Sequence, residues 1–123
     1  MKKILIVEDE KILAEMYKDK FSQEGLEVFL SFEASEALKL AKEKKPDLII
    51  LDMLLPRENG ISFLGSLRKD ADISSTPVVA FSNFDDPETK KEAFQLGVKE
   101  YLIKTNYTPQ QIVEKIKKYL LNE

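Results

Sequence analysis

The chain has 123 residues, of which 43% are hydrophobic and 33% charged, a composition typical of one globular domain with its own hydrophobic core. The net charge of −3 without a basic patch argues against direct binding of nucleic acid. The chain contains no cysteine and no histidine, which excludes disulfides, thiolate or imidazole metal sites, cysteine nucleophiles and histidine-based triads. Any bound metal therefore needs oxygen ligands, which favours hard cations such as Mg²⁺, Mn²⁺ or Ca²⁺.

The N-terminal segment "MKKILIV" begins like a signal peptide. However, only a short apolar run precedes the acidic segment "EDE" at 8–10, and this run is too short for a signal-peptide core. No stretch reaches transmembrane length. The sequence therefore predicts a cytoplasmic protein without a membrane partner. We expect residues 1–123 to form a single domain, with no output domain.

Short apolar runs alternate along the chain with segments of helical periodicity. The runs lie at 4–7, 28–30, 48–51, 77–81 and 101–103. Because these runs are continuously apolar rather than alternating, they are typical of parallel strands covered on both faces. Apolar residues at helical spacing follow each run: Ile12, Leu13, Met16, Tyr17 and Phe21; Ala34, Ala37, Leu38 and Ala41; Ile61, Leu64 and Leu67; Ala93, Phe94 and Leu96; Ile112, Val113, Ile116, Tyr119 and Leu120.

Capping signals agree with these boundaries. The segment "DDPE" (85–88) offers an aspartate N-cap with proline in the first turn, and "TPQQ" (108–111) offers a capping box. Gly25 and Gly97 lie where helices should end before the second and fifth strands. Alternating strands and helices predict a flavodoxin-like, doubly wound (βα)5 sandwich, with a parallel five-stranded sheet in the order 2-1-3-4-5.

Polar residues follow all five apolar runs. In a sheet of this kind, ligands bind at the carboxyl ends of the strands, near the point where the strand order reverses. Glu8 and Asp9 follow the first run, Asp52 the third, Ser82 the fourth and Lys104 the fifth. Three neighbouring carboxylates repel one another unless a cation neutralises them, and oxygen ligands favour Mg²⁺.

The cation, the lysine and the hydroxyl group together would form a cradle for a phosphoryl group. Since the chain has no Ser-His or Cys-His pair, Asp52 is the expected nucleophile, forming an aspartyl phosphate. Each residue also has an ordinary structural interpretation. Asp9 alone is more often an N-cap, Asp52 alone can begin an Asx turn, and Ser82 or Lys104 alone is usually a turn or solvated residue. Ser31 follows an edge strand and should lie outside the cluster.

These motifs resemble the receiver domain of two-component response regulators, over the whole chain. The segment "VEDE" resembles the acidic pair of the family, and "LDMLLPRENG" resembles its phosphoacceptor segment. Ser82 matches the switch serine or threonine, Tyr101 the switch aromatic residue and Lys104 the lysine of the motif. Two positions depart from the family pattern: Thr105 replaces a cis-proline after the lysine, and Asn83 replaces a small residue after the switch hydroxyl.

The resemblance implies a phosphorylation-controlled signalling module that is otherwise not an enzyme. A histidine kinase or phosphotransfer protein would donate the phosphoryl group to Asp52. Asp9, Asp52 and the backbone carbonyl of Leu54 would ligate Mg²⁺, with Glu8 acting through water. The downstream protein partner would bind the two helices that begin in "DDPE" and "TPQQ", together with the strand at 101–103.

Three alternatives come from other classes of protein. A pseudo-receiver would bind partners without being phosphorylated, but the acid cluster, Ser82 and Lys104 are all present. A phosphatase of the haloacid dehalogenase class would carry a D-x-D motif after the first strand and a cap insertion, whereas the expected nucleophile here follows the third run. A flavin-binding flavodoxin would need a Ser/Thr-rich phosphate loop after the first strand, where this chain has "EDEK".

Overall fold

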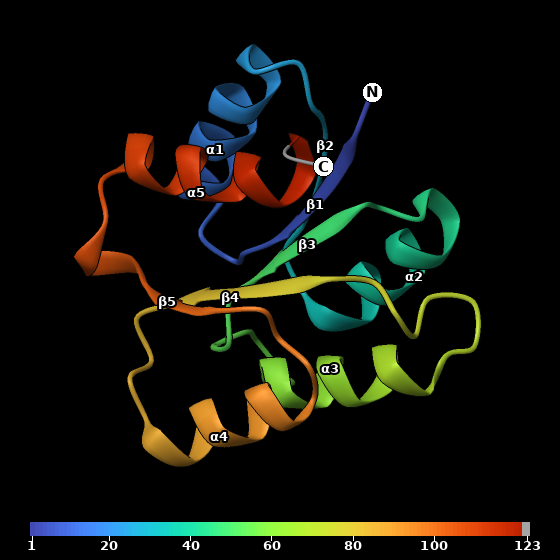
Figure 1. The fold of residues 1–123 in the computed structure, drawn as a ribbon. Helices are drawn as coiled ribbons and strands as arrows, with labels where there is room; N and C mark the ends of the chain where they lie inside the picture. The colour runs from blue at the N-terminus through green and yellow to red at the C-terminus, as the bar shows by residue number, and fades with distance from the viewer. Residues whose placement is uncertain (122–123) are drawn as a thin grey trace.

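A parallel sheet forms the centre of the molecule, and helices cover both of its faces (Figure 1). The structure, a computed structural model, describes residues 1–121. The strands are β1 (Lys3–Val7), β2 (Glu27–Ser31), β3 (Leu48–Leu51), β4 (Val78–Ser82) and β5 (Tyr101–Ile103). The helices are α1 (Lys11–Gln23), α2 (Ala34–Lys44), α3 (Gly60–Lys69), α4 (Pro87–Gln95) and α5 (Pro109–Leu121), with a 3-10 turn, η1 (Lys104–Asn106), between β5 and α5.

The strand order β2-β1-β3-β4-β5, with every pair parallel, confirms the predicted doubly wound sheet. Helices α1 and α5 lie on one face, and α2, α3 and α4 lie on the other (Figure 1). Successive residues of a strand point to opposite faces. Leu5 and Val7 therefore join the core under α2 and α3, whereas Ile4 and Ile6 join the core under α1 and α5. This double burial explains why the strands are apolar throughout.

The predicted helix ends are confirmed by the hydrogen bonds that cap them. Asp86 accepts from the backbone N of Thr89 at 2.9 Å. Thr108 and Gln111 exchange side-chain and backbone hydrogen bonds of 2.8 and 3.2 Å. Gly25 and Gly97 end their helices with φ values of 85° and 86°, a left-handed conformation in which a side chain is disfavoured.

Three details of the predicted elements are wrong. Strand β4 begins at Val78 rather than Pro77, because proline has no N–H to donate to the neighbouring strand. Ile12 in α1 and Phe94 in α4, both expected in apolar stripes, are 89% and 51% exposed. The buried face of α1 contains Tyr17 and Phe21, and Ile12 lies five positions before Tyr17, about 140° around the helix.

The loop between β3 and α3 folds back onto the residue that follows Asp52. The N–H of Gly60 donates to the carbonyl of Met53 at 2.9 Å, and a Cβ atom on Gly60 would lie 2.9 Å from the Cα of Met53. Asn59 caps α3 by accepting from the N–H of Ser62 at 3.0 Å. The glycine of "LDMLLPRENG" is therefore required by this close approach. Among the described residues, no helix is both long and apolar enough to span a bilayer.

Candidate functional site

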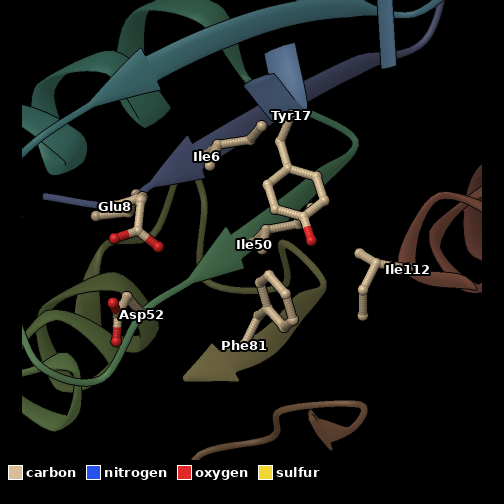
Figure 2. Close-up of a pocket in the computed structure, with 8 residues that line it drawn as sticks. Ile6, Glu8, Tyr17, Ile50, Asp52, Phe81 and Ile112 are labelled. Carbon is tan, nitrogen blue, oxygen red and sulfur yellow. The ribbon is translucent and has the colours of Figure 1, made fainter. Parts of the chain in front are cut away.

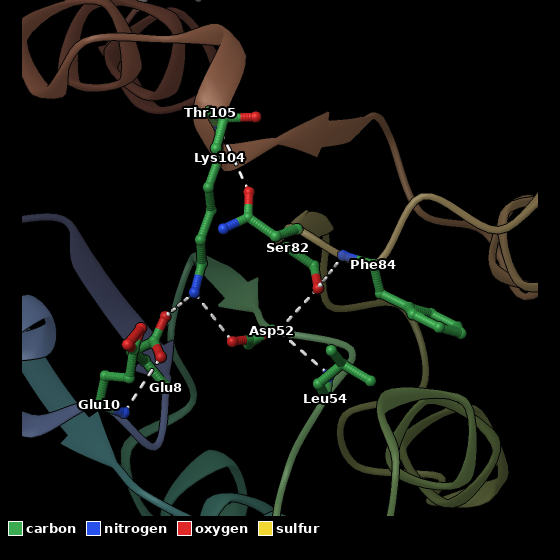
Figure 3. Close-up of polar contacts among 9 residues, drawn as sticks. Glu8, Glu10, Asp52, Leu54, Ser82, Phe84, Lys104 and Thr105 are labelled. Carbon is green, nitrogen blue, oxygen red and sulfur yellow. Dashed lines mark hydrogen bonds and ion pairs between the residues drawn. The ribbon is translucent and has the colours of Figure 1, made fainter.

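The polar residues predicted at the strand ends meet at the carboxyl edge of the sheet (Figure 3). Glu8 directly follows β1, Asp52 directly follows β3, and Ser82 is the last residue of β4. Lys104 directly follows β5 and begins η1. Glu8, Asp52 and Ser82 are 4%, 6% and 0% exposed. Two buried carboxylates therefore lie beside a buried hydroxyl, and such an arrangement requires a compensating cation.

That cation is the ammonium group of Lys104. Its Nζ lies 2.5 Å from Oε1 of Glu8 and 2.9 Å from Oδ2 of Asp52. Burial disfavours the ammonium ion, but the hydrogen bonds to both carboxylates outweigh this effect and raise the pKa of Lys104. Burial raises the pKa of Glu8, and the hydrogen bond from Lys104 opposes that rise. Lys104 therefore stays charged and shares its charge between two acids.

The second oxygen of Asp52 is also occupied. Oδ1 accepts from the hydroxyl of Ser82 at 2.8 Å and from the backbone N–H of Leu54 at 3.0 Å. The contact with Leu54 is the Asx turn that the sequence alone suggested. The structural interpretation of Asp52 and the functional one are thus compatible, because the turn fixes the direction in which the carboxylate points.

Asp9 completes a group of three acids. Carboxylate oxygens of Glu8, Asp9 and Asp52 lie within 4.8 Å of one another. Asp9 does not cap α1, since the cap position belongs to Glu10, whose side chain makes no capping hydrogen bond. The backbone N–H of Glu10 instead donates to Oε2 of Glu8 at 3.1 Å. Three hard oxygen donors at this spacing fit a divalent cation such as Mg²⁺.

A small cavity lies beneath Glu8 and Asp52 (Figure 2). Its volume is ≈ 10 Å³, about the space that one water molecule needs. The rest of its labelled lining is largely apolar: Ile6, Tyr17, Ile50, Phe81 and Ile112. This cavity cannot admit an organic substrate or a flavin between the carboxylates and the core. A reacting group must therefore approach Asp52 from the outer side.

Tyr101 lies near the cluster without contacting it. Its hydroxyl donates to the backbone carbonyl of Phe84 at 2.6 Å, and the ammonium of Lys90 lies 5.8 Å from the centre of its ring. Burial, with a contribution from the charge of Asp52, raises the pKa of Tyr101 to about 12. The predicted switch residue is therefore connected to the site through Phe84.

The contact between Asn83 and Thr105 was not foreseen. Oδ1 of Asn83 accepts from the backbone N–H of Thr105 at 3.1 Å. The Lys104–Thr105 peptide is trans, as are all peptides of the described residues. The signal was present in the sequence, because a residue other than proline after Lys104 adds an N–H that can donate to a nearby acceptor. Sequence reasoning identified both unusual residues but did not connect them.

Proteins of one family are similar to this chain in sequence and fold. The model of the response regulator receiver domain matches residues 4–117. The polar-differentiation response regulator DivK of Brucella anthropi is 32% identical over 119 residues, which are 97% of this chain and 96% of DivK. PhoP of Bacillus subtilis, an alkaline phosphatase synthesis transcriptional regulatory protein, is 31% identical over 97% of this chain and 48% of its own length.

Solved structures agree with these relatives. A putative response regulator from Chloroflexus aurantiacus superposes with a TM-score of 0.84 at 29% identity, and 97% of each chain is covered. The chemotaxis protein CheY4 of Vibrio cholerae superposes with a TM-score of 0.88 at 27% identity, over 98% of this chain and 99% of its own.

The position of Lys104 between two acids predicts its effect on stability. In buffer containing EDTA, Lys104→Met should lower the free energy of unfolding by about 3 kcal/mol, because it leaves two carboxylates without their cation. Chemical denaturation measures this change. Lys99→Met is the matched control, since Lys99 is exposed. Equal stability of the two variants would show that Lys104 does not compensate the buried acids.

Proposed function

The chain belongs to the family of response regulator receiver domains, and on this premise we propose that it is a signalling module that accepts a phosphoryl group on Asp52. The observation that carries the proposal is the environment of this carboxylate. Asp52 is nearly buried and makes charged and neutral hydrogen bonds to Lys104 and Ser82. The apolar cavity beneath it leaves only the outer side for an incoming group.

Phosphoryl transfer to Asp52 balances without a further reagent. A carboxylate oxygen attacks the phosphorus of a phosphohistidine on a histidine kinase or phosphotransfer protein, and the P–N bond breaks. The imidazole leaves as a neutral ring with the electron pair of that bond, because its other nitrogen carries a proton. Asp52 becomes an acyl phosphate. Lys104 and Ser82, which now contact the carboxylate, would donate to the oxygens of the transferred group.

Glu8, Asp9 and Asp52 would hold Mg²⁺, with the backbone carbonyl of Leu54 as a further ligand and Glu8 acting through water. When bound, Mg²⁺ neutralises charge on the phosphoryl oxygens. The spacing of the three carboxylates supports this assignment. Lys104 already occupies one oxygen of Glu8 and one of Asp52, so its ammonium group would have to share both acids with the metal ion.

A continuous series of hydrogen bonds supports Ser82 and Tyr101 as switch residues. Ser82 donates to Asp52, the N–H of Phe84 lies 3.2 Å from Oγ of Ser82, and the carbonyl of Phe84 accepts from Tyr101. If the phosphoryl group draws the hydroxyl of Ser82 away from its present partners, the loop that holds Tyr101 must adjust. The downstream protein partner would bind the surface formed by α4, β5 and α5. Tyr101 belongs to β5, and the loop with Ser82 and Phe84 leads into α4.

The phosphoacceptor is tested by intact mass after incubation with acetyl phosphate and Mg²⁺. The wild type should gain one phosphoryl group, and Asp52→Asn should gain none. Asp47→Asn is the control, because Asp47 accepts from the backbone N–H of Lys3 at 2.8 Å on the opposite edge of the sheet, and it should be labelled normally. Labelling of the Asp52→Asn protein would contradict the assignment. A wild type that binds Mg²⁺ but is never labelled, even by a histidine kinase, would favour a pseudo-receiver.

The same labelled sample tests the switch. Amide chemical shifts measured by NMR should change in the 82–84 loop, α4, β5 and α5, because the hydrogen-bonded series from Asp52 leads there. Tyr101→Phe removes the hydroxyl that anchors the ring to Phe84 and should reduce the part of the change that reaches α4. Shift changes confined to α1 and α2 would be incompatible with this surface.

Mg²⁺ should raise the melting temperature, because it binds the folded state and not the unfolded chain. At ten times the dissociation constant the gain in stability is about 1.4 kcal/mol. Asp9→Ala should remove most of this rise, because Asp9 supplies one of the three clustered carboxylates. Asp19→Ala, an exposed aspartate of α1, is the control and should keep the rise. A wild-type melting temperature that does not respond to millimolar Mg²⁺ would refute the metal site.

A further inference from the structure

Asn83 and Thr105 are joined in a closed ring of contacts around the site. Ser82 donates to Oδ1 of Asp52, and Lys104 donates to Oδ2 of the same carboxylate. Asn83 directly follows Ser82, and Thr105 directly follows Lys104. The hydrogen bond from the Thr105 N–H to Asn83 then closes the ring. Two separate loops are thereby fixed to each other one residue beyond the point where each contacts Asp52.

This hydrogen bond satisfies a group that would otherwise lack a partner within the turn. Thr105 lies in η1, and the first N–H groups of a helical turn have no acceptor inside it. Because the partner is a backbone donor, the oxygen of the Asn83 amide must be the atom that faces Thr105. A small residue at 83 has no such acceptor, and a proline at 105 has no such donor. The two departures from the family pattern therefore form one interaction.

We propose that Asn83 and Thr105 are a positioning pair, which sets the separation of Ser82 and Lys104 and so speeds phosphoryl transfer to Asp52. The role rests on the proposed function and adds to it. The donors that meet the transferred phosphoryl group lower the barrier only if they are already in place when the charge develops. The backbone N of Thr105 and the side chain of Asn83 touch no reacting atom. They act through the residues that precede them.

A double-mutant cycle tests the pair. The variants are Asn83→Ala, Thr105→Pro and the combination, and the readout is the rate at which Asp52 is labelled by acetyl phosphate with excess Mg²⁺. All measurements are made at a temperature where every variant is folded, so that a merely structural role leaves the rate unchanged. Asn83→Ala should slow labelling about fivefold in the Thr105 background, the effect of one lost hydrogen bond. In the Thr105→Pro background it should have no effect, because the donor is already missing.

Proline at 105 introduces strain of its own. This strain cancels when Thr105→Pro is compared with the double variant, since both proteins contain the proline. Asn106→Ala is the matched control, because Asn106 is an exposed asparagine in the same turn, without a side-chain hydrogen bond among the described residues. It should be labelled at the wild-type rate. Equal slowing by Asn83→Ala in both backgrounds, or wild-type rates in every variant, would overturn the positioning role while leaving the proposed function intact. If the wild type takes no label from acetyl phosphate or from a histidine kinase, the proposed function fails and the positioning role fails with it.

Discussion

The rest of the site depends on the ion pairs that the ammonium group of Lys104 makes with Glu8 and Asp52. Without it, the two nearly buried carboxylates would repel each other. Among the described residues, no other lysine or arginine is buried near them. With it, each acid has a cation within hydrogen-bond distance, and one oxygen of Asp52 stays directed toward Ser82 and Leu54. The cluster still holds three acids for one ammonium group, so a group that brings more negative charge needs a metal ion to enter with it.

The parallel sheet is what makes this contact possible. Lys104 lies 96 residues from Glu8 and 52 from Asp52 in the chain, yet each follows a strand whose carboxyl end reaches the same edge. Right-handed crossovers return every strand in the same direction, so polar residues placed after apolar runs accumulate there. The apolar walls beneath the site keep the carboxylates at this edge.

Two hydrogen-bonded routes lead away from Asp52, and they serve different purposes. One passes through Ser82 and Phe84 to Tyr101 and reaches the surface formed by α4, β5 and α5. The other passes through Asn83 to Thr105 and returns to Lys104. Under the proposed function, the first route would transmit a change at the carboxylate, because it ends at an aromatic side chain that is only half-buried. The second is closed on itself and so restrains the residues that make the change.

The sequence by itself determined the sheet order, the helix ends and the strand-end residues that meet at one edge. These properties depend on local signals: apolar runs, glycines at helix ends, capping residues and the parity of side chains along a strand. It did not determine whether Ile12 would lie on the buried face of α1, because several rotations of that helix bury a similar number of apolar residues. It also did not determine that Tyr101 would bond to Phe84, or that Asn83 would meet Thr105. Those contacts join loops from different strands, and only the packed tertiary structure decides the distance between such loops.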